Sequence, residues 1–171
     1  IAGLLCIASA LNYLDRQTLA VLIGTIKDEL HLSNADYGTI NAWFLVSYGV
    51  MYAGSGLIID YIGTRRGFFL FVIGWSIANM LHMLASTVGQ FSFFRFLLGV
   101  FEPGSFTGGV RAVSEWFPMK DRALAIGIFN AGTAFVSMPA APIVSIIALH
   151  WGWRSAFFVT GALGAVWAAA W

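Results

Sequence analysis

Four charged residues lie inside long apolar stretches of this sequence, and they are the residues best suited to do chemistry. Asp15 and Arg16 are adjacent in the first stretch, whereas Arg95 and Glu102 lie seven positions apart in the fourth. An ionised group at membrane depth is costly, so such groups usually face a cavity and mark the path of an ion or substrate. The two acids can exchange protons, and the two arginines can hold an anion.

The pairing of acids with arginines predicts a link between anion binding and proton binding. An arginine stays charged, and its planar fork matches a carboxylate. An anion that engages Arg16 or Arg95 competes with the acid partner, so Asp15 or Glu102 then takes up a proton more readily. The alternative is a set of buried ion pairs that fix the helix register, although buried pairs are weak stabilisers.

Other polar side chains in the apolar stretches are weaker candidates for the same site. A hydroxyl or amide there either contacts a substrate or forms a hydrogen bond between helices. His82 is expected to be a packed or interfacial histidine. The candidates for substrate contact are Tyr13, Tyr48, Asn130 and Thr133.

The composition predicts an integral membrane protein. Of the 171 residues, 59% are apolar and 10% are charged, whereas soluble domains carry roughly 25% charged residues. A net charge of +1 without a basic run argues against nucleic-acid binding. The single Cys6 excludes a disulfide framework and offers no cysteine-based metal site. We expect no metal or organic cofactor, with the proton as coupling ion.

We predict an all-α membrane protein with six transmembrane helices in one bundle over residues 1–171. A helix needs about 20 residues to cross about 30 Å of hydrocarbon. Ser33 to Asp36 is a capping-box pattern that starts the second helix. Pro139 and Pro142 predict a kink near the outer end of the fifth. The predicted helices are 1–24, 35–59, 67–87, 90–113, 121–149 and 153–171.

The connections orient these helices. The second-to-third and fourth-to-fifth connections, with the helix ends beside them, are the more basic, so the positive-inside rule places them in the cytoplasm. Glu102 then lies near the membrane midplane, with Arg95 about 10 Å further out on nearly the same face. Asp15 is about 14 Å from the outer end of its helix, also near mid-depth. The cytoplasmic basic residues are Arg65, Arg66, Arg111, Lys120 and Arg122, against Lys27 and Arg154 outside.

The turn after the second helix resembles the loop signature of the major facilitator superfamily, G-x-x-x-D-R/K-x-G-R-R/K. Its spacing is close to the pattern, but Tyr61 replaces the usual basic residue and Thr64 the first arginine. The resemblance implies a gating loop that latches the outward-facing state against a second half of the protein. In that loop the acid and arginines can form an interhelical charge network at the cytoplasmic face. The loop residues are Gly56, Asp60, Gly63, Arg65 and Arg66.

A finer resemblance is to the anion:cation symporter branch of that superfamily, which includes bacterial hexuronate and galactonate transporters. It rests mainly on Asn12–Arg16 and Arg95–Glu102, and it covers almost the whole chain. It implies that Asp15 and Glu102 couple protons, and that Arg16, Tyr48 and Arg95 face a sugar-acid site. Supporting matches are Glu115–Pro118, Arg122–Ala125, Gly127–Gly132 and Gly152–Arg154.

The resemblance also implies an architecture and a location. Family members have twelve helices in two halves, each half built from two inverted three-helix repeats. This chain has no initiator Met and begins and ends in apolar sequence, so we expect it to be the amino-terminal half. Its expected partners are the lipid bilayer, a carboxy-terminal six-helix half and a small organic anion. The expected location is the bacterial inner membrane.

The sequence leaves several functions open. The first hypothesis is proton-coupled symport of a hexuronate or related sugar acid by alternating access. The same fold could instead move another carboxylate or phosphate, or use sodium. A structural membrane subunit without transport is a more distant alternative. An intramembrane enzyme is not expected, because neither paired aspartate motifs nor a Ser/His pair at depth is visible.

Overall fold

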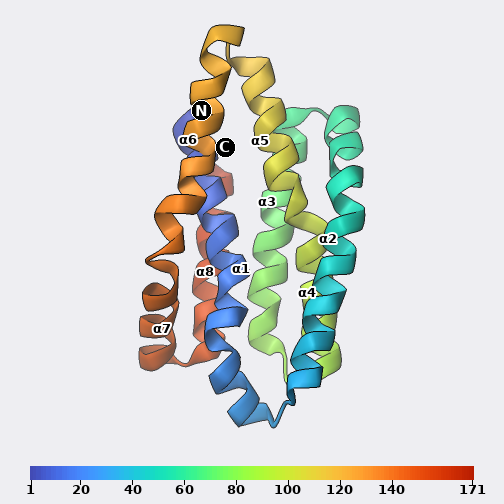
Figure 1. The fold of residues 1–171 in the computed structure, drawn as a ribbon, viewed down its shortest axis with the longest axis vertical. Coiled ribbons are helices and arrows are strands. Elements are labelled where there is room, and N and C mark those ends of the chain that lie inside the picture. Colours follow the sequence, from blue (N-terminus) through green and yellow to red (C-terminus); the bar gives the residue numbers. More distant parts are fainter.

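The structure, a computed structural model, describes residues 1–171 as an elongated bundle of α-helices whose axes run mostly along its length (Figure 1). The amino and carboxyl termini lie near the same end of the bundle. The helices are α1 (Ala2–Leu30), α2 (Asn34–Ile62), α3 (Thr64–Leu81), α4 (Val88–Phe101), α5 (Pro103–Trp116), α6 (Arg122–Ser137), α7 (Ala140–Trp151) and α8 (Trp153–Ala170), with short 3-10 helices η1 (His82–Leu84) and η2 (Met119–Asp121).

Prolines divide two of the six predicted segments, so the chain forms eight α-helices. The fourth segment breaks at Glu102, because Pro103 lacks the N–H that would continue the α4 ladder and instead begins α5. The fifth breaks before Ala140, and the axes of its two parts differ by 49°. Pro139 precedes α7 directly. The kink predicted there is confirmed, but its position is nearer the middle of the segment than its outer end.

The helix ends agree with the predictions at some positions and differ at others. The capping box is confirmed: the Ser33 hydroxyl accepts from the Asp36 N–H, and the Asp36 carboxylate accepts from the Ser33 N–H. The predicted end of the first helix at residue 24 is wrong, because α1 continues to Leu30. His31 caps this end: its backbone is left-handed, and its N–H donates to the Lys27 carbonyl.

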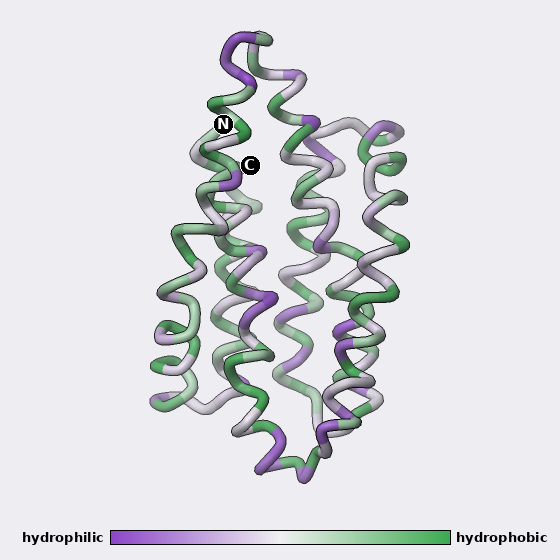
Figure 2. Tube along the Cα trace, viewed as in Figure 1, coloured by the Kyte–Doolittle hydropathy of each residue, from purple (hydrophilic) through white to green (hydrophobic).

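By length and apolar composition, α2 and the continuous α3–η1 segment can each cross a membrane, and the bent Met119–Trp151 pair forms a third candidate. The break at Glu102 leaves α4 and α5 with 14 residues each, below the length of a single crossing. The six predicted crossings and the inverted repeats therefore stay predictions. Figure 2 shows hydrophilic segments at both ends of the bundle and further hydrophilic stretches midway along it.

Two buried apolar clusters hold the helices together. One is built around Phe68, Phe71 and Trp75 of α3 and includes residues of α1, α5 and α8. The other is built around Leu19 and Ile26 of α1 and includes residues of α4, α7 and α8. Many large apolar side chains remain exposed on the outside, among them Leu57, Leu124 and Val166. An apolar exterior of this extent suits a chain surrounded by lipid or by further protein.

Candidate functional site

An ion pair between α1 and the α4–α5 junction forms the centre of the candidate site. Two nitrogens of the Arg16 guanidinium, Nη2 and Nε, donate to Glu102 Oε2 over 2.7 Å and 2.9 Å. The Glu102 side chain is fully buried, whereas the Arg16 side chain is 36% exposed. Because the cation keeps an open side, a second anion can reach it from the cavity.

This pair lies in the wall of a small cavity of about 150 Å³ between α1, α2, α5 and α6. Ligand pockets usually measure about 300–1,000 Å³, so this volume suits one part of a site better than a whole one. The structure brings six of the predicted site residues to it: Arg16, Glu102, Tyr13, Tyr48, Asn130 and Thr133. The full lining is Ser9, Asn12, Tyr13, Arg16, Tyr48, Glu102, Ser105, Phe106, Phe129, Asn130 and Thr133.

Aromatic rings of α2 hold the Arg16 guanidinium. Its carbon Cζ lies 4.8 Å from the centroid of the Tyr48 ring and 5.6 Å from that of Phe44. Rings at this distance attract a cation through their electron-rich faces. Tyr48 therefore orients the arginine from one side while Glu102 binds it from another. Sequence reasoning found Tyr48 and missed Phe44.

Small residues allow the helices around the cavity to approach closely. A Cβ atom at Gly132 of α6 would collide with the Cys6 carbonyl of α1. Beside this contact, the hydroxyls of Ser9 in α1 and Thr133 in α6 form a hydrogen bond of 2.6 Å that joins the same two helices. A Cβ atom at Gly99 of α4 would likewise collide with the α2 backbone at Phe44. These contacts hold Thr133 and the aromatic rings of α2 at the cavity.

Arg95 lies beside this cavity but does not line it. Its side chain is buried, its Nη2 donates weakly to the Arg16 carbonyl over 3.5 Å, and its Cζ lies 5.5 Å from the Phe44 ring centroid. Phe44 thus contacts both arginines. The expected position of Arg95 facing the substrate site is not the one that this structure shows, and its role stays a prediction.

Asp15 lies away from the cavity, although it is adjacent to Arg16 in sequence. Its Oδ1 accepts from Asn79 Nδ2 of α3 over 2.7 Å, and that amide also approaches Thr160 Oγ1 of α8 at 2.8 Å. All three residues are buried. Sequence reasoning missed Asn79 and Thr160, although an amide in the middle of an apolar helix was a signal that could have identified Asn79.

The loop between α2 and α3 differs from its predicted charge network. Asp60 pairs with Arg111 of α5 at 3.5 Å, and Arg111 also pairs with Glu115 at 2.9 Å. Asp60 is therefore in an interhelical charge network as expected, but Arg65 and Arg66 form no ion pair and are not part of it. These two arginines follow the turn in the first turn of α3. Gly63 makes the turn with φ of 87°, a conformation that favours glycine, while Gly56 lies one turn before Asp60 in α2.

A further polar contact joins α1 to α8 at the opposite end of the bundle. Glu29 accepts from Arg154 Nη1 and from Trp153 Nε1, both over 2.6 Å. The hydrogen bond from Arg154, followed by that from Trp153, lowers the pKa of Glu29 below its ordinary value. The pair is exposed, so water screens it strongly.

Comparisons with known proteins agree on one family. The model described as "Major Facilitator Superfamily" matches residues 5–171. The chain is 36% identical to a galacturonate transporter of Dickeya chrysanthemi, covering 99% of this chain and 49% of that protein. It is 34% identical to the hexuronate transporter of Escherichia coli K12, covering 99% of this chain and 39% of that protein. The chain thus spans less than half of the length of each of these two relatives.

A solved structure supports the fold. The bacterial homologue of the human lysosomal transporter Spinster, in an inward-facing and occupied conformation, superposes with a TM-score of 0.85 at 26% identity. The match covers 99% of this chain and 42% of that one. The similarity therefore extends over nearly all the helices described above and over less than half of the solved protein.

Proposed function

Because this chain belongs to the major facilitator superfamily, we propose that it supplies one wall of the substrate site of a secondary transporter. The transporter carries a small organic anion, a hexuronate or related sugar acid, together with protons by alternating access. The chain forms the amino-terminal half, with six membrane-crossing helices in two inverted repeats, in a bacterial inner membrane. A second half of similar size supplies the facing wall.

The observation that carries this proposal is a partly exposed arginine paired with a fully buried acid. Arg16 binds Glu102 with two of its nitrogens and still reaches the cavity. A substrate carboxylate that takes over the guanidinium leaves Glu102 buried without its counter-charge, and a buried unpaired carboxylate is unfavourable. Uptake of a proton by Glu102 removes that cost. Anion binding and proton binding then support each other.

The remaining cavity wall favours a polyhydroxylated anion. Tyr13, Asn12 and Asn130 present a hydroxyl and two amide side chains to the same space as Arg16. Sugar hydroxyls need such donors and acceptors, because a buried hydroxyl without a partner weakens binding. The printed names of the relatives, a galacturonate and a hexuronate transporter, support the same class of substrate.

The test is uptake by the intact protein in proteoliposomes with an imposed pH gradient. We expect labelled galacturonate or glucuronate to accumulate, and Glu102→Gln to abolish gradient-driven accumulation while retaining some exchange. Glu29→Gln, an exposed acid at the bundle end, is the matched control and should accumulate substrate normally. Uncoupler-insensitive accumulation by Glu102→Gln would contradict proton coupling through this residue.

The alternatives are separated in the same vesicles. A panel of competing acids distinguishes sugar acids from other carboxylates and from phosphate. Replacing sodium with potassium distinguishes sodium from proton coupling. A protein that neither transports nor is stabilised by any acid of the panel would support the structural-subunit alternative and contradict the proposal.

A further inference from the structure

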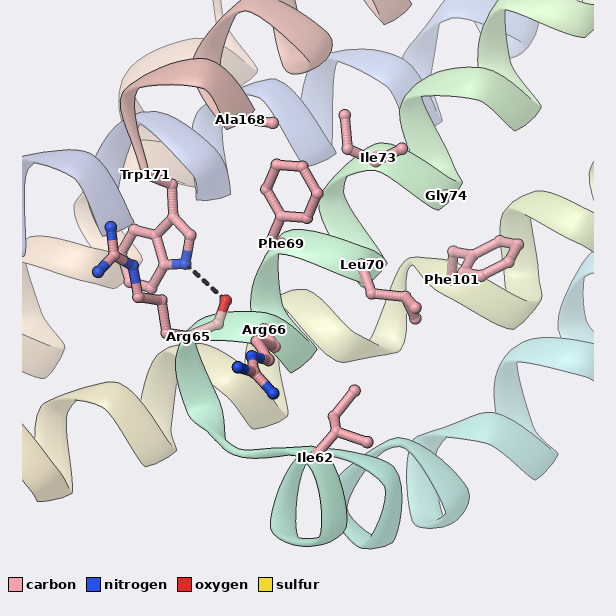
Figure 3. A pocket seen from close by; sticks show the side chains of 10 residues that line it. All are labelled: Ile62, Arg65, Arg66, Phe69, Leu70, Ile73, Gly74, Phe101, Ala168 and Trp171. Atoms are coloured by element: carbon pink, nitrogen blue, oxygen red, sulfur yellow. Dashed lines mark hydrogen bonds between the residues drawn. The ribbon is translucent and has the colours of Figure 1, made fainter.

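A second, larger hollow lies elsewhere on the bundle and shares no residue with the Arg16 cavity. It is an open groove of about 1080 Å³ formed mainly by α3 and the end of α8 (Figure 3). Seven of its ten lining residues are hydrophobic. They are Ile62, Arg65, Arg66, Phe69, Leu70, Ile73, Gly74, Phe101, Ala168 and Trp171.

The polar part of the groove is confined to one end. Arg65 and Arg66 are both exposed there, and neither is in an ion pair. Trp171 Nε1 donates to the Arg65 carbonyl over 2.9 Å, and the Arg65 side chain lies beside the indole ring (Figure 3). Two unpaired arginines with a tryptophan are typical of the membrane headgroup zone.

The apolar part has the depth of one membrane leaflet. From Arg65 to Gly74 is nine residues along α3, or about 14 Å of helix, close to half of the roughly 30 Å hydrocarbon core. The inner end is closed by Phe101, since a Cβ atom at Gly74 would collide with its ring. Phe101 precedes Glu102, the residue predicted near the midplane.

The groove lies on a different side of the bundle from the cavity that would meet a second half. Residues of α1, α2, α5 and α6 line the Arg16 cavity, and no residue of α3 or α8 does. Conversely, no residue of α1, α5 or α6 lines the groove. The exposed side chains of Phe69 and Leu70 on α3 are therefore placed to meet lipid.

We propose that this groove binds an anionic phospholipid of the cytoplasmic leaflet, with its phosphate on Arg65 and Arg66 and one acyl chain along Phe69, Leu70 and Ile73. Charge and apolar length together select this occupant. Basic pockets between membrane helices on the cytoplasmic side bind anionic headgroups, and each arginine near the surface adds to that attraction. A free phosphate would leave the apolar part empty, and a zwitterionic lipid would bring a cationic group that repels both arginines.

The test is native mass spectrometry of the intact protein in neutral detergent, titrated with phosphatidylglycerol and with phosphatidylcholine of the same acyl chains. We expect phosphatidylglycerol to bind at least about tenfold more tightly. The double variant Arg65→Gln, Arg66→Gln should bring it to the phosphatidylcholine level, while Arg65→Lys, Arg66→Lys should retain most of the preference. Lys120→Gln removes an exposed charge outside the groove and should change affinity less than about twofold.

Leu70→Trp tests the acyl-chain half of the groove independently of charge. Leu70 is exposed, so a larger side chain there fills the groove without entering the core. It should weaken binding of both lipids. If the glutamine double variant fails to fold, the lipid preference of the unmodified protein and the Leu70→Trp result decide the question.

Three outcomes would overturn the proposal. The first is unchanged phosphatidylglycerol affinity in the glutamine double variant or in Leu70→Trp. The second is equal competition by inorganic phosphate or glycerol phosphate, which would make the arginines a site for soluble anions. The third is retention of neither lipid together with disulfide cross-linking of Leu70→Cys to a cysteine in the second half, which would show that protein covers the groove.

Discussion

Asp15 and Arg16 are neighbours in the chain, but they lie in two different regions of the molecule. Arg16 lines the cavity between α1, α2, α5 and α6 and pairs with Glu102. Asp15 is sealed between α1, α3 and α8, where Asn79 donates to it. One region is open to a ligand and contains an ion pair, in which Glu102 Oε1 has no hydrogen-bond partner. The other is closed, and Asp15 Oδ2 has no hydrogen-bond partner there.

The comparison teaches that membrane depth and location are separate properties. Both acids are predicted near mid-depth by residue counting, but only Glu102 shares a cavity with an arginine. We therefore expect the two acids to differ in function: Glu102 responds directly to the substrate, whereas Asp15 serves the packing of α3 and α8 against α1. The four predictions below test that division.

The largest effect is expected from removing the cation of the open region. Arg16→Ala leaves Glu102 buried without its partner and removes the contact for a substrate carboxylate. Initial uptake by the intact protein in proteoliposomes should fall at least about 30-fold, since truncating one partner of a hydrogen-bonded charge pair costs about 2–5 kcal/mol of binding free energy. Arg154→Ala, an exposed arginine, is the control. Wild-type uptake by Arg16→Ala would remove the basis for calling this region the site.

A smaller, purely structural effect is expected in the closed region. Asn79→Leu leaves the Asp15 carboxylate and the Thr160 hydroxyl without their donor, which should lower the free energy of unfolding by about 1–3 kcal/mol. Denaturant unfolding in detergent measures this change, and Asn79→Ser serves as a milder variant. Substrate affinity, measured by calorimetry, should change less than about twofold because the cavity is untouched. A loss of affinity as large as that of Arg16→Ala would show that the closed region also belongs to the substrate site.

The exposed Glu29–Arg154 pair shows what a similar contact contributes without burial. The folded pKa of Glu29 is lowered, so its stabilisation is present above the unfolded value of about 4.3 and is lost as the pH falls through the folded pKa. Arg154→Gln should lower the free energy of unfolding at pH 7 by less than about 1 kcal/mol, which is measured as a slightly lower thermal midpoint. The difference from wild type should disappear as the pH falls below the folded pKa of Glu29. A difference that grows toward acid pH would reverse this sign.

The smallest effect is the coupling between the two regions. The pairs Arg16–Glu102 and Asp15–Asn79 share no residue. Stability changes of Arg16→Lys and Asn79→Ser should therefore add within about 0.5 kcal/mol in a double-mutant cycle. A coupling energy well above that value would show that α1 transmits a change from one region to the other, and it would replace the division with a single network.

Local signals in the sequence predicted much of this molecule. Ser33 and Asp36 predicted the start of α2, and prolines predicted the break before α7, because capping and the missing proline N–H act within a few residues. Six of the proposed site residues line one cavity because their helical spacing places them on shared faces. The end of α1 was less predictable, since helix ends depend on fine differences in capping.

The charges inside apolar helices, the all-helical membrane class and the resemblance to transporters were determined by the sequence alone, since composition and local spacing carry them. Only the tertiary structure decided that Arg16 and Asp15 belong to different regions, that Asn79 reaches Asp15, and that Asp60 pairs with Arg111. Adjacent helical residues differ in direction by about 100°, and which neighbour each one meets depends on helix rotation. That rotation is set by side-chain packing between segments far apart in the chain.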